Sequence, residues 1–168
     1  KLRYEILPMV KLKDVPDVAR RLGELLGQEK ESYQFAQQWE RDIKSTTEPV
    51  KKGGTKTLIE LQKDPLIVAG GNTFLTEMVE LCGGKNIFDD QTGYPRVSLE
   101  LILMRKPQLI LITGMLASET QGSVKRWGEI FKASAPQVVV LDPDTSTRPG
   151  PRLLRGLQKV CEVMAQRK

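Results

Sequence analysis

The stretch PLIVAGGNTFLTEMVELCGGKNIF, residues 65–88, decides the fold of this chain. Its short apolar run over residues 66–69 predicts a buried strand, and two glycines then lead into a helix expected over residues 73–82. A second glycine pair, Gly83 and Gly84, is typical of a helix end, because glycine readily adopts the left-handed backbone found there. Strand, glycine turn and helix in this order predict part of an α/β layer.

Strands and helices keep alternating on both sides of this stretch. Further strands are expected over residues 56–61, 109–113 and 138–141, and further helices over residues 122–132 and 151–166, with a helix to Arg105 capped by Ser98. The last two strands are continuous apolar runs, the signature of parallel strands covered by helices on both faces. We therefore expect an α/β lobe in three layers, a mainly parallel sheet covered by helices.

The amino-terminal part is expected to be mostly helical. Residues 2–8 resemble a short strand, and Asp14 is expected to cap a helix that ends at Gly27. A longer helix is expected from about residue 28 to residue 47, and the turn-rich stretch 48–55 ends it. At a rise of 1.5 Å per residue this second helix is about 30 Å long, which is enough to cross a lobe.

Composition argues against several classes of function. The 168 residues include 26 basic and 21 acidic side chains, which are interspersed and give a net charge of +5. The few aromatic residues form no stacking platform, so no nucleic-acid partner is expected. No segment has the roughly twenty apolar residues of a membrane span. Without histidine, a nucleophile lacks its usual base and zinc its usual ligands, so we expect neither an enzyme nor a metal site.

The stretches 65–88, 93–100 and 107–113 together resemble the carboxyl-terminal lobe of periplasmic binding proteins that deliver cobalamin, haem and iron-siderophores to ABC importers. The resemblance implies the end of an amino-terminal lobe over residues 1–13, a helical inter-lobe connector over residues 14–54 and a substrate-binding lobe over residues 55–168. It also implies a periplasmic or extracytoplasmic location, with a lipid anchor left open, a metal chelate as ligand, no cofactor, and an ABC transporter permease as partner.

Other classes of function stay open on the residues alone. A stand-alone α/β nucleotide-binding or enzymatic domain would use the turn at Gly70 and Gly71, and a scaffold or sensor domain would keep the lobe without transport. One lobe holds only half of a cleft. The resemblance therefore predicts weak or absent ligand binding by these residues alone, and an exposed cleft face that can associate with another copy.

Gly71, Asn72 and Thr73 are candidate substrate-binding residues. They lie where a strand leads into a helix, so backbone amides and the positive end of the helix are expected to point outward at the carboxyl edge of the sheet. The spacing matches neither GxGxxG nor the Walker sequence. Glycines needed only for a tight turn are the alternative interpretation.

Tyr94, Asp144 and Thr147 are the other candidate ligand contacts. Tyr94 precedes a proline, which favours an extended backbone and presents the ring on a loop, where it either packs or stacks on a ligand. In the cobalamin binders that the chain resembles, an aromatic residue holds this place. Alignment by the Arg-x-x-Pro-Arg stretch that the chain shares with these binders places Asp144 and Thr147 at polar positions of the cleft. Thr147 stands where the binders have an acidic residue, and this difference argues against cobalamin as the ligand but not against the class of protein.

Glu100 lies in the first turn of the helix that Ser98 caps, where a carboxylate complements the helix dipole. The resemblance adds a second role for this residue. In similar binding proteins the glutamate of the Val-Ser-x-Glu stretch is an exposed anchor for an arginine of the membrane permease. Glu100 is therefore a candidate partner-docking residue.

The two cysteines, Cys82 and Cys161, each lie near the end of a predicted helix. As residues alone, they read either as buried free thiols or as a disulfide formed in an oxidising compartment. Both coincide with cysteines of similar cobalamin-binding proteins, so the resemblance implies a Cys82–Cys161 disulfide.

Overall fold

The structure is a computed structural model, which describes residues 4–50, 53–114, 117–132 and 135–166. Its centre is a five-stranded sheet with the order β2-β1-β4-β5, and β3 pairs with β1 beside β2. The strands are β1 (Thr55–Gln62), β2 (Ile67–Val68), β3 (Gly84–Asn86), β4 (Leu109–Ile112) and β5 (Gln137–Val140). All pairings except that of β2 with β1 are parallel. The expected α/β lobe with a mainly parallel sheet is confirmed.

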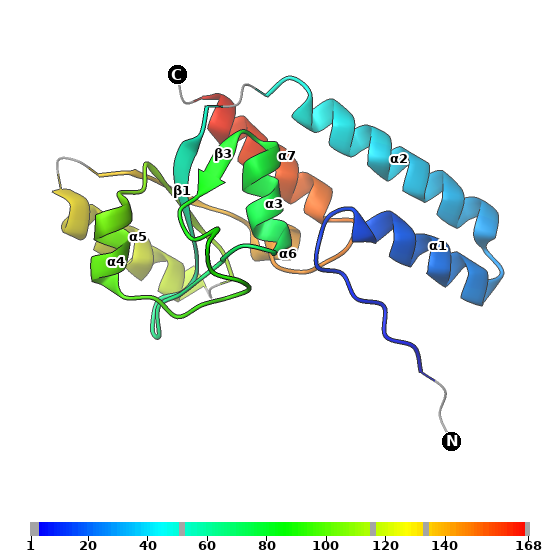
Figure 1. Cartoon of the computed structure of the whole chain (residues 1–168), viewed down its shortest axis with the longest axis horizontal. Coiled ribbons are helices and arrows are strands. Elements are labelled where there is room, and N and C mark those ends of the chain that lie inside the picture. The colour runs from blue at the N-terminus through cyan, green and yellow to red at the C-terminus, as the bar shows by residue number, and fades with distance from the viewer. Residues whose placement is uncertain (1–3, 51–52, 115–116, 133–134, 167–168) are drawn as a thin grey trace.

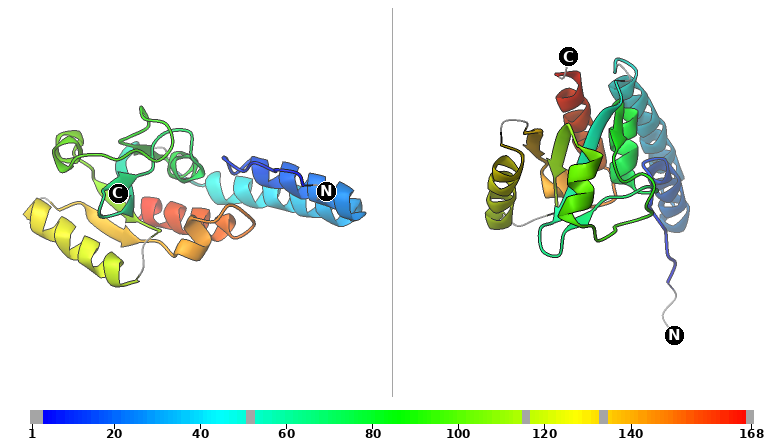
Figure 2. Two further views of the ribbon diagram at one scale, coloured as in Figure 1. Left: turned by 90° about the horizontal axis from the view of Figure 1, so that it is seen from below. Right: turned by 60° about the vertical axis from the view of Figure 1, so that its left-hand side comes forward.

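Helices cover both faces of the sheet, as the two views of Figure 2 show. One core cluster joins β1 and β4 to helices α3 and α7, and a second joins the opposite face of the same strands to α4 and α5. The bounds are α3 (Phe74–Leu81), α4 (Leu99–Arg105), α5 (Ala117–Phe131), α6 (Pro143–Ser146) and α7 (Leu153–Ala165). Because Leu58 and Ile59 alternate between the faces and are both buried, β1 lies between two apolar layers.

The two amino-terminal helices, α1 (Asp14–Leu26) and α2 (Glu29–Thr47), lie side by side and project beyond the sheet (Figure 1). Gly27 ends α1 in the left-handed conformation, with φ 67°, and its N–H donates to the Gly23 carbonyl. A side chain at Gly23 would meet Ser32 Oγ of α2 at 2.1 Å, so glycine permits the close approach of the two helices. The expected helices and the turn at Gly27 are confirmed.

Two hydrogen bonds hold the segment before α1, one to the lobe and one to α2. The backbone N–H of Leu12 donates to Glu77 Oε2 of α3 at 2.6 Å. The Trp39 indole N–H of α2 donates to the Leu12 carbonyl at 3.2 Å. Helix α2 also packs against α7. The segment before α1 is therefore fixed between α2 and α3.

Two expectations for the start of the chain are wrong, and the expectation for the last strand holds in part. Residues 4–10 have no regular secondary structure, so no strand forms there, and residues 1–3 lie outside the described part. Asp14 is the first residue of α1 and does not cap the helix. Its Oδ2 instead accepts from the N–H groups of Val10 and Lys11, both at 2.8 Å. Strand β5 is only partly covered: Val139 and Val138 pack against the core clusters of the two faces, whereas Val140 is 46% exposed.

The cysteines form the expected disulfide between the end of α3 and α7. Cys82 and Cys161 are 79 positions apart, and their Cα atoms are 4.7 Å apart. Both residues are buried in the core cluster on that face of the sheet. The bond therefore joins two distant parts of the sequence within one helical layer.

Candidate functional site

The candidate site is the edge at which the parallel strands β1, β4 and β5 end. The chain leaves β1 through the turn that leads to β2, leaves β4 at Thr113 and leaves β5 through the loop that contains α6. The Thr113 and Ser146 hydroxyls are hydrogen-bonded, and the Ser146 hydroxyl also lies 2.7 Å from the Asp142 carbonyl. These contacts hold the loops after β4 and β5 together.

Asp144 and Thr147 lie in the loop after β5. Asp144 is exposed, and its carboxylate forms an ion pair with Arg148 at 3.2 Å. Thr147 is half-buried, donates its hydroxyl to the Pro143 carbonyl at 2.6 Å, and has its methyl group 3.6 Å from the Cβ position at Gly114. The structure thus places both residues beside the loop after β4.

The turn at Gly70 and Gly71 differs from the expectation. Strand β2 runs antiparallel to β1, so the turn lies level with the middle of β1, at the end of the short strand β3. The Gly70 N–H donates to the Gly93 carbonyl at 2.7 Å, and the Gly71 N–H donates to the Gln91 carbonyl at 2.6 Å. The expected outward-pointing amides are therefore already occupied by the neighbouring loop.

The residues after this turn divide into a buried and an exposed one. Thr73 is 3% exposed; its hydroxyl accepts from the Thr76 N–H at 3.2 Å and so caps α3. Asn72 is exposed and has a φ of 57°, a left-handed conformation that asparagine tolerates. Ligand contact by Gly71, Asn72 and Thr73 stays a prediction, and only Asn72 presents a free side chain for it.

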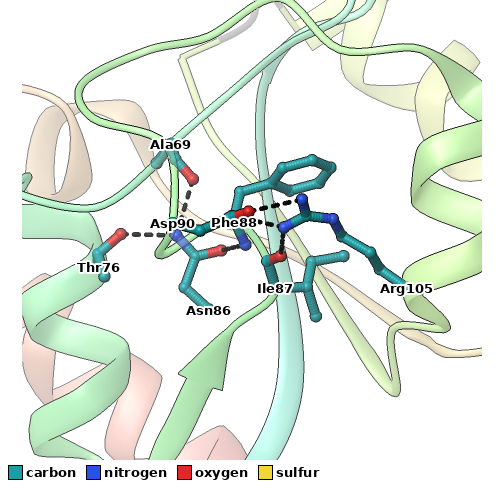
Figure 3. Close-up of polar contacts among 7 residues, drawn as sticks. All are labelled: Ala69, Thr76, Asn86, Ile87, Phe88, Asp90 and Arg105. Carbon is teal, nitrogen blue, oxygen red and sulfur yellow. Dashed lines mark hydrogen bonds and ion pairs between the residues drawn. The ribbon is translucent and has the colours of Figure 1, made fainter.

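The loop that carries Tyr94 is anchored at its start by Asn86, whose contacts are drawn in Figure 3. The buried Asn86 amide group donates to the Ala69 carbonyl at 2.8 Å and to the Thr76 hydroxyl at 2.7 Å, and its oxygen accepts from the Phe88 N–H at 3.0 Å. One side chain thus joins β3, the start of α3 and the loop that follows.

Arg105 at the end of α4 anchors the same loop from the other side (Figure 3). Its guanidinium donates to the Ile87 carbonyl and forms a two-pronged pair with Asp90, with N–O distances of 2.6 and 2.8 Å. It also lies over the Phe88 ring, 4.4 Å from the ring centroid. The hydrogen bond from Arg105 lowers the pKa of Asp90, so this carboxylate stays ionised at neutral pH.

Tyr94 follows this anchored loop in an extended segment that pairs with β2. The Val68 N–H donates to the Pro95 carbonyl at 3.1 Å, and the Val97 N–H donates to the Leu66 carbonyl at 3.0 Å. The Tyr94 side chain is 49% exposed, and partial burial raises the pKa of its phenol. The structure therefore presents a neutral, half-buried aromatic ring on a fixed backbone, beside Gly70.

Glu100 is exposed in the first turn of α4, which Ser98 caps by accepting from the Leu101 N–H at 3.3 Å. The pKa of Glu100 is lowered by its own backbone N–H and then by the Ser98 hydroxyl. The carboxylate is thus charged and exposed close to the turn between β1 and β2, because Val97 pairs with Leu66 there.

Sequence reasoning missed the residues that hold this site in place. Asn86, Asp90 and Arg105 fix the loop of Tyr94, but their partners lie on other elements. The buried Glu60 of β1 accepts from Ser123 Oγ at 2.9 Å, from Arg126 at 2.6 Å and from the Trp127 indole N–H, and so fixes α5. A charged residue inside an apolar strand, Thr-Leu-Ile-Glu-Leu, was the available signal for Glu60.

Hollows of the described surface occur away from this edge. One of about 370 Å³ lies between α1, α2 and α3 and is lined by Leu12, Trp39 and Ile43 among others.

In the described ranges, no group of three or more histidine, cysteine, aspartate or glutamate side chains is placed to hold a metal ion. No helix in the described residues is long and apolar enough to cross a membrane.

Solved structures share this fold. The periplasmic vitamin B12 binding protein of Vibrio cholerae superimposes with a TM-score of 0.81 at 22% identity, over 96% of this chain and 65% of that one. A periplasmic haem-binding protein from Roseiflexus sp. RS-1 gives a TM-score of 0.80 at 21% identity, over 93% and 64%. At such identities the likeness shows the fold alone.

Sequence similarity identifies the family. Residues 8–147 match the periplasmic binding proteins, so the chain belongs to the periplasmic binding protein family. The vitamin B12-binding protein of Yersinia pestis (strain Pestoides F) is 33% identical over 141 residues, which cover 80% of this chain and 48% of that protein. The chain thus spans about half the length of the curated relatives it matches. Both the family and these relatives are binding proteins.

Proposed function

We propose that this chain forms the carboxyl-terminal lobe and inter-lobe helices of the substrate-binding component of an ABC importer for a metal chelate such as cobalamin, haem or an iron-siderophore. The observation that carries the proposal is the 33% identity to a vitamin B12-binding protein over 80% of the chain. In this proposal the segment up to residue 13 ends a preceding lobe, residues 14–54 connect the lobes, and residues 55–168 form one wall of the cleft.

The geometry of the sheet edge supports a large ligand held between lobes. Tyr94 lies outside β2 at one end of the sheet, whereas Asp144 and Thr147 follow β5 at the other end. Side chains spread along a whole edge suit a broad chelate better than a small molecule enclosed in one pocket. Asn72 and Tyr94 are the contacts proposed near β2, and Asp144 and Thr147 those near β5.

The disulfide supports a location outside the cytoplasm. Bonds such as Cys82–Cys161 form and persist in the periplasm and other oxidising compartments. A periplasmic or extracytoplasmic protein is therefore proposed, and a lipid anchor on the full-length protein would fit the same role. We also propose that the chain alone associates with itself through its uncovered cleft wall, which sedimentation of the 168-residue chain would test.

Glu100 is proposed to dock onto the permease. Its carboxylate is charged and exposed, and a rim contact with an arginine would orient the complex and raise the association rate. Replacing Glu100 with Gln in the full-length protein should slow association with the cognate permease. Glu80→Gln, a matched change at an exposed position of α3, should leave the rate unchanged. Equal rates for both variants would refute docking through Glu100.

Ligand titration tests the proposed function directly. The full-length protein should bind cobinamide, haemin or a ferric siderophore with a micromolar or tighter Kd, and the 168-residue chain should bind the same compound weakly or not at all. Tyr94→Ala should weaken binding by the full-length protein, because a stacking surface is lost. A thermal-shift screen with nucleotides tests the rival nucleotide-binding function. Stabilisation by a nucleotide, with no response to any chelate, would overturn the proposal.

A further inference from the structure

Tyr94 and Arg96 lie side by side on one face of an extended segment. Residues 95–97 pair with β2, and along residues 92–97 exposed and half-buried side chains alternate. Thr92, Tyr94 and Arg96 are exposed, whereas Pro95 and Val97 are half-buried. Because side chains two positions apart point to the same face of a strand, the Tyr94 ring and the Arg96 guanidinium share the outer face.

Arg96 is free to bind a ligand. Its side chain forms no hydrogen bond or ion pair with the residues that the structure describes, whereas Arg105, Arg126 and Arg148 all pair with carboxylates. A free guanidinium offers a planar fork of N–H donors that matches the oxygens of a carboxylate or phosphate. The ring beside it supplies a stacking surface and a phenol that stays neutral because burial raises the pKa of Tyr94.

The surrounding backbone fixes this pair and leaves the Arg96 guanidinium without an ion pair among the described residues. The loop before Tyr94 is held by Asn86 and Arg105 (Figure 3), and β2 holds the segment itself. The neighbouring turn adds the exposed Lys63 and Asp64, whose charges cancel. The exposed Glu100 of α4 lies close to this turn without an ion pair to Arg96. Arg96 therefore sets a positive charge beside the aromatic ring.

We infer that Arg96 is a specificity-determining residue that binds an acidic oxygen group of the ligand, a carboxylate or a phosphate, while Tyr94 stacks against the ligand's planar part. The inference rests on the proposed function and narrows its substrate class to chelates that carry such a group. A charge-assisted, forked contact on a fixed backbone favours the acidic ligand over its neutral analogue.

The test compares matched ligands on the full-length protein. Haemin is compared with its dimethyl ester, which lacks free carboxylates, and cobalamin with cobinamide, which lacks the nucleotide and with it the phosphodiester. Ferrichrome is the neutral ferric chelate. The protein should bind the acidic member of one pair about tenfold more tightly or better. Arg96→Gln should remove that preference, and Arg96→Lys should restore part of it because the charge returns without the fork.

Arg155→Gln is the matched control, because Arg155 is an exposed arginine of α7 and forms no side-chain bond within the described residues. This variant should keep the full preference. Equal binding of acidic and neutral members, or a preference that survives Arg96→Gln, would overturn the inference while leaving chelate binding intact. Failure of every chelate to bind would overturn the proposed function, and the inference with it.

Discussion

The α/β lobe (residues 53–166) and the helical arm (residues 4–47, with α1 and α2) bury their apolar side chains to different extents. In the lobe, β4 is at most 1% exposed at every position. In the helical arm, Leu26 is 72% exposed and Tyr4 87%. Further exposed apolar residues of the helical arm are Ile6, Val10, Leu22, Leu25 and Tyr33. The core cluster on the α3 and α7 face of the lobe also includes Leu12, Val15 and Trp39 of the helical arm, whereas the other apolar side chains named here are exposed in the described structure.

Polar contacts differ between the two regions in the same way. The lobe contains a fully buried carboxylate, Glu60, with hydrogen bonds from three side chains, and a disulfide. The helical arm contains surface ion pairs such as those of Arg20 and Arg21. Exposed pairs contribute little to stability, and a broken buried network costs several kcal/mol. We therefore expect the lobe to carry most of the stability and the helical arm to open first.

The largest effect should come from the disulfide of the lobe. Replacing both Cys82 and Cys161 with Ser should lower the free energy of unfolding by about 4 kcal/mol, because the bond closes a long loop in the unfolded chain. Urea denaturation measures the change, and reduction of the unmodified protein with dithiothreitol should reproduce it. An unchanged urea midpoint after substitution and after reduction would contradict the expected stability of the lobe.

Loss of the buried carboxylate should rank next. Glu60→Gln keeps the volume but turns an amide toward the donors of Ser123, Arg126 and Trp127, so unfolding should become easier by about 2 kcal/mol. Glu129→Gln is the control, since Glu129 pairs with Lys125 only at the surface of α5, at 3.8 Å. It should change stability by less than about 0.5 kcal/mol. Equal effects of the two variants would show that the buried network does not fix α5.

A glycine in each region provides the next comparison. Gly23→Ala would place a methyl group 2.1 Å from Ser32 Oγ, so the helices of the arm must separate, at a cost of about 1–3 kcal/mol. Gly128→Ala meets no atom within 4 Å in α5 and should stabilise the lobe by about 0.5–1 kcal/mol. Hydrogen exchange should show faster exchange in α1 and α2 alone for Gly23→Ala. Faster exchange throughout the lobe would show that both regions unfold together.

Much of the lobe could be predicted from local patterns. The continuous apolar run over residues 109–113 predicted β4, and Ser98 caps α4 as expected. Strand β3 was missed because Gly-Lys-Asn has no apolar pattern and becomes a strand only by pairing with β1. The direction of β2 was also missed, since two residues reveal no direction without their partner.

The candidate site could be predicted less well, because its geometry depends on contacts distant in sequence. The exposed Tyr94 and Glu100 follow from a proline and a helix cap nearby. The amides of Gly70 and Gly71 looked free because their acceptors, Gly93 and Gln91, lie on a later loop. The burial of Glu60 depends on donors more than sixty positions away, which no local pattern shows.

Low pH should destabilise the loop before Tyr94, because protonation of Asp90 removes its ion pair with Arg105. Pairing with Arg105 lowers the pKa of Asp90 in the folded state. The ion pair therefore contributes fully to stability above the pKa of Asp90 in the unfolded chain, about 3.9, and this contribution is lost as the pH falls through the lowered pKa of the folded state. Asp90→Asn should therefore speed amide exchange over residues 86–93 at neutral pH, and the difference from the unmodified protein should shrink below about pH 4. A difference in amide exchange that does not depend on pH would show that the charge of Asp90 does not stabilise this loop.

The smallest effect should come from the corresponding pair in the helical arm. Arg21 binds Glu5 with two N–O distances of 2.7 and 2.9 Å, nearly the geometry of Arg105 with Asp90, and this hydrogen bond likewise lowers the pKa of Glu5. Glu5, however, precedes α1 in a segment without secondary structure, and no aromatic ring or carbonyl group supports the guanidinium among the described residues. Water competes for both partners, so Glu5→Gln should leave the urea midpoint and the exchange of α1 unchanged at any pH. A lower urea midpoint or faster α1 exchange in this variant would mean that the Glu5–Arg21 pair stabilises α1, and the contrast between the two regions would then lie in their apolar burial alone.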